Sequence, residues 1–116
     1  MASTAFITHR DCHLHDMGSF HPESPARLGA ISDHTLAQGL DHYFAYYEAP
    51  LATFAQLLRV HSAAHLERLK RISPHIGIAH IDPDTAMNPH TWQAALRSAA
   101  AGVMAVDLLM AGEVQN

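Results

Sequence analysis

The chain has 116 residues, of which 48% are hydrophobic and 16% are charged, and its net charge is −4 at pH 7. This length allows one small domain with a modest core, and the charged fraction lies below the usual quarter of a soluble domain, so the polar surface is thin. The negative balance and the lack of any Lys/Arg-rich run argue against a protein that binds nucleic acid or anchors electrostatically to a membrane.

No segment of the sequence predicts secretion or a membrane span. Residues 1–20 lack a basic region followed by an apolar stretch, so no secretory signal is visible. The longest apolar stretch, AAAGVMAVDLLMAG, is too short to span a bilayer and contains Asp107. The single cysteine, Cys12, permits no internal disulfide, which suits a reducing compartment. We therefore expect a cytoplasmic protein.

The N-terminal segment predicts a strand, a loop and a helix. Residues 5–8 are apolar with β-branched members, which favours a strand, and a polar loop rich in His, Asp and Gly follows at 9–24. Ser24 is a suitable N-cap and Pro25 is a preferred first helical residue. A helix is therefore expected from this point to a C-cap at Gly39.

The middle of the chain predicts a second strand and two short helices. Residues 43–47 have strand propensity. Thr53 and Gln56 have the spacing of a capping box, in which each side chain satisfies a free backbone N–H at the helix start, so a helix is expected at about 54–60. Ser62 is positioned to cap a further helix.

The C-terminal part predicts a third strand and the clearest helix. Residues 76–81 alternate and are rich in isoleucine, which favours a strand, and a turn is expected at 82–85. Asn88 and Pro89 are a cap and first-turn pair for a helix that ends at Gly112. Its apolar residues recur at helical spacing: Trp92, Ala95, Leu96, Ala99, Val103, Val106 and Met110. Strands that alternate with helices predict an α/β fold with a parallel sheet.

Eleven histidines suggest metal binding, proton transfer or pH sensing, but none of their clusters has the spacing of a complete site. The loop 9–16 concentrates imidazole, thiolate and carboxylate groups, yet a structural zinc site would need a second, distant pair of ligands. His61 and His65 are four residues apart, but Ser62 stands where a zinc protease has glutamate. Cys12 lacks the other features of an acyl-transfer site and is interpreted as a loop thiol.

Two polar turns are the better candidates for a site: His21-Pro22-Glu23 and Asp82-Pro83-Asp84-Thr85. Each lies where a loop or strand leads into a helix, which is where α/β proteins build their sites. These residue types are also common in ordinary turns and caps. From the residues alone, the chain therefore has two candidate loops and no catalytic centre.

Four blocks resemble, in order, the N-terminal part of the histone deacetylase superfamily, and in particular its bacterial histone-deacetylase-like and acetylpolyamine amidohydrolases. They are CHLHDMGSFHPESPARLGAI (12–31), LLRVHSAAHLERL (57–69), IDPDTAMNPHTWQAAL (81–96) and RSAAAGVMAVDLLMAGEVQN (97–116). The first block is the most specific, whereas the alanine-rich last block would mean little alone. The resemblance implies the N-terminal part of a three-layer α/β/α arginase/deacetylase-like fold with a parallel sheet.

The resemblance also implies the hydrolysis of acetyl-lysine or acetyl-amine amides. In the family, zinc held by two aspartates and a histidine polarises the acetyl carbonyl, a histidine pair acts as general base and acid, and a tyrosine stabilises the oxyanion. The motif that resembles Arg-Pro-Pro-Gly-His-His is expected just after Asn116, and no two histidines are adjacent in this chain. We therefore expect residues 1–116 to form a single partial domain without catalytic residues or metal ligands, which is inactive alone. Zinc and an acetylated lysine or polyamine substrate are expected for the full-length parent.

The resemblance assigns secondary roles to the two turns. Arg27 matches an arginine beside the internal cavity through which acetate leaves, where a guanidinium can bind the carboxylate product. His21, Pro22 and Glu23 would shape this region and one wall of the substrate channel. Asp84 matches an aspartate at the channel rim that accepts hydrogen bonds from the substrate backbone, and Asp82 is the alternative to it.

Two other hypotheses stay open. A stand-alone binding module could retain this scaffold without catalysis, and it would cover its apolar faces and strand edges by forming a homo-oligomer. A small histidine-rich metal-binding protein is the other.

Overall fold

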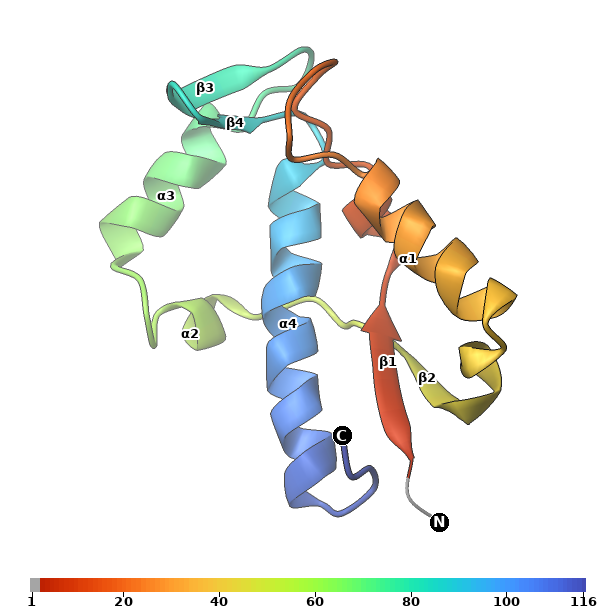
Figure 1. Ribbon diagram of the computed structural model, residues 1–116. Coiled ribbons are helices and arrows are strands. Elements are labelled where there is room, and N and C mark those ends of the chain that lie inside the picture. The colour runs from red at the N-terminus through yellow and green to blue at the C-terminus, as the bar shows by residue number, and fades with distance from the viewer. Residues whose placement is uncertain (1–2) are drawn as a thin grey trace.

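In the computed structural model, which describes residues 3–116, short strands and helices surround one long helix (Figure 1). The long helix, α4, lies in the middle, with the paired strands β1 and β2 on one side and the helices α2 and α3 on the other. The elements are β1 (Thr4–Thr8), the 3-10 helix η1 (Arg10–His13), α1 (Ala26–Ala37), the 3-10 helix η2 (Leu40–Tyr43), β2 (Phe44–Glu48), α2 (Phe54–Leu57), α3 (Ala63–Ile72), β3 (Ala79–Asp82), β4 (Thr85–Met87) and α4 (Thr91–Met110).

Strands β1 and β2 form a parallel pair, because the helix α1 carries the chain back between them. Phe6 lies directly opposite Tyr46, and Phe44 completes an aromatic cluster on the same face. The ring centroid of Phe6 lies 5.3 Å from that of Phe44 and 5.4 Å from that of Tyr46. The α/β class and its parallel strands are therefore as the sequence predicts.

The third strand differs from the prediction. It begins at Ala79 rather than at residue 76, and it pairs antiparallel with β4, in the region where the sequence analysis has a turn and a helix cap. Pro83 and Asp84 are the only residues between the two strands, and a connection this short allows only an antiparallel partner. The hairpin therefore forms a separate two-stranded sheet and does not extend the parallel one.

The helix boundaries follow the capping residues. The Ser24 hydroxyl accepts a hydrogen bond from the backbone N–H of Ala26, and α1 is followed by Gly39, whose φ of +68° is in the left-handed region. Thr53 and Gln56 form both bonds of the capping box, with lengths of 3.1 and 2.9 Å. The capping box and the left-handed Gly39 are as predicted, whereas α1 begins at Ala26 with Pro25 as its N-cap, one residue later than predicted.

The helix α2 is shorter than the expected segment 54–60, because it ends at Leu57. Ser62 accepts a hydrogen bond from the N–H of His65 and has extended backbone angles, as the N-cap of α3 requires. After Leu57 the backbone changes from the α-helical hydrogen-bond pattern to i→i−3 bonds, from Arg59 to Gln56 and from Val60 to Leu57. The residues between Leu57 and Ser62 form a tight turn, in which the N–H of His61 donates to the carbonyl of Leu57.

The helix α4 joins the distant parts of the chain. It contacts β1 and η1, and after its last turn Gly112 has a φ of +71°, as expected of the residue that ends the helix. Its arginine, Arg97, donates from Nε to Asp11 Oδ2 and from Nη1 to the carbonyl oxygen of Ala49, both at 2.9 Å. By length and composition alone α4 could cross a membrane, which is weak evidence for a span, since the core helix of a soluble protein passes the same test.

The core is small and built mainly from alanine. The buried hydrophobic side chains come from the loop after β2, from α3, β4 and α4, and from the C-terminal segment: Ala49, Ala52, Leu66, Ala86, Met87, Ala94, Ala100, Leu108 and Val114. The C-terminal segment returns to β1, because the N–H of Ala5 donates to the carbonyl of Asn116 and the N–H of Gln115 donates to that of Ser3. In Figure 1 this segment lies on the side of β1 that faces away from β2.

Candidate active-site loop

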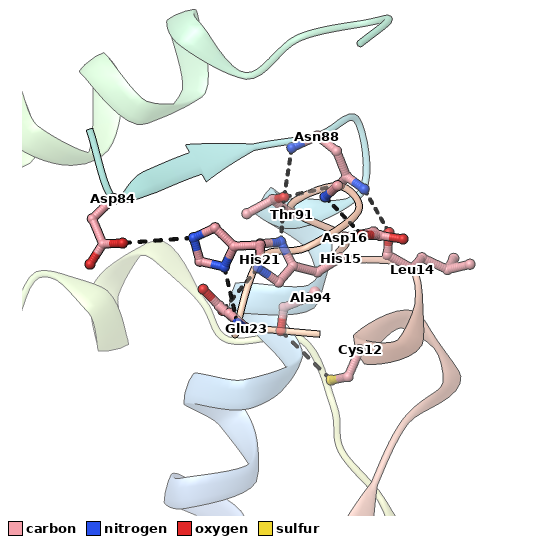
Figure 2. Close-up of polar contacts among 11 residues, drawn as sticks. Cys12, Leu14, His15, Asp16, His21, Glu23, Asp84, Asn88, Thr91 and Ala94 are labelled. Atoms are coloured by element: carbon pink, nitrogen blue, oxygen red, sulfur yellow. Dashed lines mark hydrogen bonds and ion pairs between the residues drawn. The ribbon is translucent and has the colours of Figure 1, made fainter. Parts of the chain in front are cut away.

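Three segments meet where the candidate residues lie: the loop 14–23, the β3–β4 turn and the first turn of α4. Figure 2 shows their polar side chains directed toward one another. Next to them is an open cavity of about 600 Å³. Residues from η1, from the loop, from α1, from β4 and from α4 line it, and they include Cys12, His15, Glu23, Arg27, Thr85 and Thr91.

His15 is the side chain that connects the loop to α4. Its Nδ1 lies 2.7 Å from Thr91 Oγ1, and its Nε2 lies 3.0 Å from Glu23 Oε1. The ring is mostly buried, with 19% of the side chain exposed. His15 is not among the site residues predicted from the sequence, because its partner Thr91 is 76 residues away in the chain.

Asn88 forms a second connection at the same place. Its backbone N–H donates to Thr91 Oγ1 at 2.8 Å, and its Nδ2 donates to the carbonyl of Leu14 at 2.8 Å. Its Oδ1 accepts from the N–H of His90, as expected of a residue that caps the start of α4. The capping role of Asn88 was visible in the sequence, whereas its bond to the loop was not.

His21 faces Asp84 across the gap between the loop and the β3–β4 turn (Figure 2). His21 Nδ1 accepts a hydrogen bond from the N–H of Glu23 at 3.0 Å, so in the neutral ring the proton is on Nε2. Nε2 lies 3.7 Å from Asp84 Oδ1, which is within ion-pair distance but too long for a hydrogen bond. His21, Pro22, Glu23 and Asp84 are thus brought together from the two predicted turns.

Asp82 has a different environment from Asp84. Its Oδ1 accepts a hydrogen bond from the N–H of Asp84 at 2.8 Å, which closes the turn between β3 and β4. This backbone hydrogen bond, aided by others from Thr85, lowers the pKa of Asp82 below its ordinary value of 3.8. The Asp82 carboxylate is engaged inside the turn, and that of Asp84 is almost fully exposed beside His21.

Arg27 is on the first turn of α1 and lines the cavity together with Glu23. The hydrogen bond between the N–H of Arg27 and the carbonyl of Ser24 forms part of the helix start. Ser24 and Pro25 therefore fix the start of the helix, and with it the position of the Arg27 backbone beside the cavity. Of the site residues predicted from the sequence, Glu23 and Arg27 line the cavity, whereas the cavity lining does not include His21, Pro22, Asp82 or Asp84.

The environment of Cys12 does not favour a thiolate. Burial, aided by the neighbouring Asp11 carboxylate, raises the pKa of the Cys12 thiol above its ordinary value of 9.0. Its Sγ lies 3.9 Å from the carbonyl of Ala94. Because a nucleophilic cysteine needs a lowered pKa, this agrees with its interpretation as a plain loop thiol.

Asp11 is held by Arg97 beneath this loop. The hydrogen bond from the Arg97 side chain is the main cause that lowers the pKa of Asp11 below 3.8. His9 Nδ1 lies 3.2 Å from the same carboxylate, but it already accepts a hydrogen bond from the N–H of Asp11. The contact between His9 and the Asp11 carboxylate is therefore not a donated hydrogen bond.

Among residues 3–116, no three or more His, Cys, Asp or Glu side chains gather into a group that could hold a metal ion. His61 and His65 do come together at the start of α3, with ring centroids 5.3 Å apart, but both are exposed and a third ligand is not near them. The described residues therefore do not fit a zinc centre, and no chemical step of this chain is assigned to zinc.

Comparison with known proteins gives a consistent family assignment. The model of the histone deacetylase domain family matches residues 21–116. A histone deacetylase-like amidohydrolase of Pseudomonas aeruginosa is 35% identical over 95 residues, which are 82% of this chain and 24% of that protein. An uncharacterized protein of Synechocystis sp. is 29% identical over 96 residues, which are 80% of this chain and 31% of that protein.

A solved structure supports the fold. The crystal structure of the HD domain of HDA15 superposes with a TM-score of 0.88 at 23% identity, and the match covers 98% of this chain and 33% of that chain. The chain thus spans about a quarter to a third of the length of the relatives that it matches.

Proposed function

The chain belongs to the histone deacetylase family, and from this premise we propose that it is the N-terminal segment of a zinc-dependent deacetylase. The whole enzyme would hydrolyse the amide bond of acetyl-lysine or of an acetylated amine such as a polyamine. The observation that carries the proposal is the convergence of Arg27, Glu23 and the first residue of β4, Thr85, on one cavity.

In this proposal the residues of the chain bind and orient the substrate and its product. Arg27 attracts the acetate product, because a guanidinium pairs with a carboxylate through two parallel hydrogen bonds. His21, Pro22 and Glu23 form one wall of the channel. Asp84 is the rim acceptor for the substrate backbone, because Asp82 uses its carboxylate inside the turn.

The chain would supply the wall and the exit of the site and not its reacting centre. Zinc, when bound in the whole enzyme, would polarise the acetyl carbonyl and activate water. Its ligands and the histidine pair would come from a part of the enzyme other than these residues. We therefore expect the isolated chain to be inactive.

A chimera tests this proposal. The 116 residues would replace the matching segment of the Pseudomonas aeruginosa amidohydrolase, and hydrolysis of acetyl-lysine peptides and acetylpolyamines would be measured. We expect the chimera to be active and the isolated chain to be inactive with or without added zinc. In the chimera, Arg27→Ala should lower turnover about tenfold or more, because a charged hydrogen-bond partner of the product is lost.

Arg68→Ala is the matched control, since Arg68 is exposed on α3 and does not line the cavity. A folded, zinc-loaded chimera that hydrolyses neither class of substrate would contradict the proposal. Hydrolysis of either substrate by the isolated chain would contradict the expectation that the isolated chain is inactive.

A second candidate function is a non-catalytic module that associates with itself. The observation that favours it is the number of large apolar side chains at the surface, among which Val60, Ile76 and Met110 each expose more than four fifths of their area. We place either form of the protein in the cytoplasm, where the single cysteine would stay reduced. Fractionation of cells that produce the chain would test this location.

The histidine-rich metal binder is the weakest of the alternatives. Among residues 3–116, one pair of histidine rings, those of His61 and His65, lies close together, with centroids 5.3 Å apart. Calorimetric titration of the purified chain with zinc at micromolar concentration would test this function. Heat of saturable zinc binding would support it, and the absence of such heat would exclude it.

A further inference from the structure

We propose that His15 is the positioning residue of the candidate site, because it fastens the loop 14–23 to the first turn of α4. Through this connection it determines where His21 and Glu23 stand relative to Asp84. What the positioned site does rests on the proposed function, whereas the positioning itself concerns this chain alone.

The loop has few other means of support. It contains no helix or strand between His15 and Ser24. Gly18 has a φ of +97°, and Phe20 has a φ of +70°, a left-handed conformation that is strained for a residue with a side chain. The Phe20 ring is fully exposed, so it contributes no packing that would repay this strain. The loop therefore depends on polar contacts to keep its shape.

The hydrogen bonds of His15 have a defined direction. The Glu23 carboxylate can only accept, so His15 Nε2 carries the proton of the 3.0 Å bond. In the neutral ring Nδ1 is then an acceptor for the Thr91 hydroxyl, 2.7 Å away, and it shares the one proton of that hydroxyl with Asn88 Oδ1 at 3.0 Å. Thr91 Oγ1 in turn accepts from the N–H of Asn88. The two nitrogens of the rigid His15 ring thus contact two partners, Thr91 and Glu23, on opposite sides of the ring.

The contacts of His15 extend through Glu23 and His21 to Asp84 on the β3–β4 turn. Glu23, held by His15, donates its backbone N–H to His21 Nδ1 and so turns His21 Nε2 toward Asp84. Asn88 fastens only the start of the loop, at the carbonyl of Leu14. Figure 2 shows His15 between these two ends, with Thr91 on one side and Glu23 on the other. His15 is therefore the contact that fixes the far end of the loop.

Amide hydrogen exchange in the 116-residue chain tests the proposal. His15→Ala and Thr91→Val should each speed exchange at Gly18 and Glu23 about fivefold or more, as expected for the loss of one hydrogen bond, while exchange in β1 and β2 stays the same. Thr91→Ser keeps the hydroxyl and should restore the slow exchange. His13→Ala, at an exposed histidine two residues from His15, is the control and should have no effect.

A spectroscopic readout separates positioning from general stability. The ring ¹⁵N signal of His15 Nδ1 should move in Thr91→Val and return to its wild-type position in Thr91→Ser, because only the hydroxyl contacts that nitrogen. If His15→Ala does not fold, the ring signal of His15 in Thr91→Val and Thr91→Ser decides the question, because it reports on the His15 contact and not on the Asn88 contacts of the same hydroxyl.

Two results would overturn the proposal: loop exchange in His15→Ala equal to that of wild type, or identical loop exchange in the two Thr91 variants. Both readouts are independent of turnover. An inactive chimera would therefore refute the proposed function without affecting this inference, and unchanged exchange would refute the inference without affecting the function.

Discussion

Arg97 connects two segments that are far from it in the sequence. From the middle of α4 it binds the Asp11 carboxylate and the carbonyl of Ala49, which lie 86 and 48 residues away in sequence. Replacement of Arg97 would leave both acceptors without their donor, and each such loss costs more than a surface contact contributes. Arg97 thus holds η1 and the segment after β2 against the central helix, beneath the candidate loop.

The pairing of Asp11 with Arg97 predicts a pH dependence of stability. Because the folded state lowers the pKa of Asp11 below 3.8, the unfolded chain binds more protons in acid. The stabilisation is therefore complete above this ordinary value and is lost as the pH falls below it. Asp82, whose pKa is also lowered, contributes in the same direction.

Urea unfolding midpoints measured between pH 5 and pH 3 would check this expectation. The midpoint of the wild type should fall with acidification, and Asp11→Asn should weaken this dependence. Asp33→Asn, at an exposed aspartate of α1, is the control and should behave like wild type. An Asp11→Asn variant with the full pH dependence would show that this pair is not the cause.

At the scale of secondary structure elements, capping side chains and left-handed glycines decide where helices begin and end. Ser24 and Asn88 accept hydrogen bonds from the N–H groups of Ala26 and His90, but α1 and α4 begin one and two residues later than predicted. Thr53 and Ser62 cap α2 and α3 as their positions predict. These boundaries were predictable because a cap and the N–H that it satisfies lie within three residues of each other. The antiparallel partner β4 was not predictable in the same way, because Thr85 to Met87 is too short to show an alternating pattern.

Two glycines of the α1 region should respond in opposite directions to alanine. Both have open space where a Cβ would be placed, so only the backbone decides the effect. Gly39→Ala should lower the free energy of unfolding by about 1 kcal/mol, because its φ of +68° is unfavourable with a Cβ. Gly29→Ala, inside the helix, should raise it by about 0.5–1 kcal/mol.

Chemical denaturation of the two variants measures this difference, and each serves as the control of the other. Equal effects of the two substitutions would mean that the backbone angle at Gly39 does not govern the end of α1.

At the scale of the whole molecule, the chain has a larger accessible surface and radius of gyration than a compact protein of the same size. Its accessible surface is 7888 Å², whereas a compact protein of 12.7 kDa exposes about 6200 Å². Its radius of gyration is 16.0 Å, compared with about 13 Å for a compact chain of this length. The excess surface agrees with a chain that matches only part of its relatives' length.

This excess predicts that the isolated chain associates with itself. Val106 and Met110 are exposed apolar residues near the end of α4, so the double variant Val106→Glu and Met110→Glu should shift the chain toward the monomer. Gln93→Glu, at an exposed residue of the same helix, adds charge without removing apolar surface and is the control. Sedimentation velocity would measure the change, and a strictly monomeric wild type would contradict the prediction.

The sequence by itself determined the helices, their caps, the parallel pair of strands and the family to which the chain belongs, since each of these depends on residues close in sequence or on an ordered set of local motifs. It also led to the two turns that carry His21, Glu23 and Asp84, and to Arg27 at the start of the following helix. Only the tertiary structure decided which side chains meet: the contacts of His15 with Thr91 and of Asp11 with Arg97 join residues 76 and 86 positions apart. Such contacts depend on the path of every intervening loop, and no local pattern of residues encodes that path.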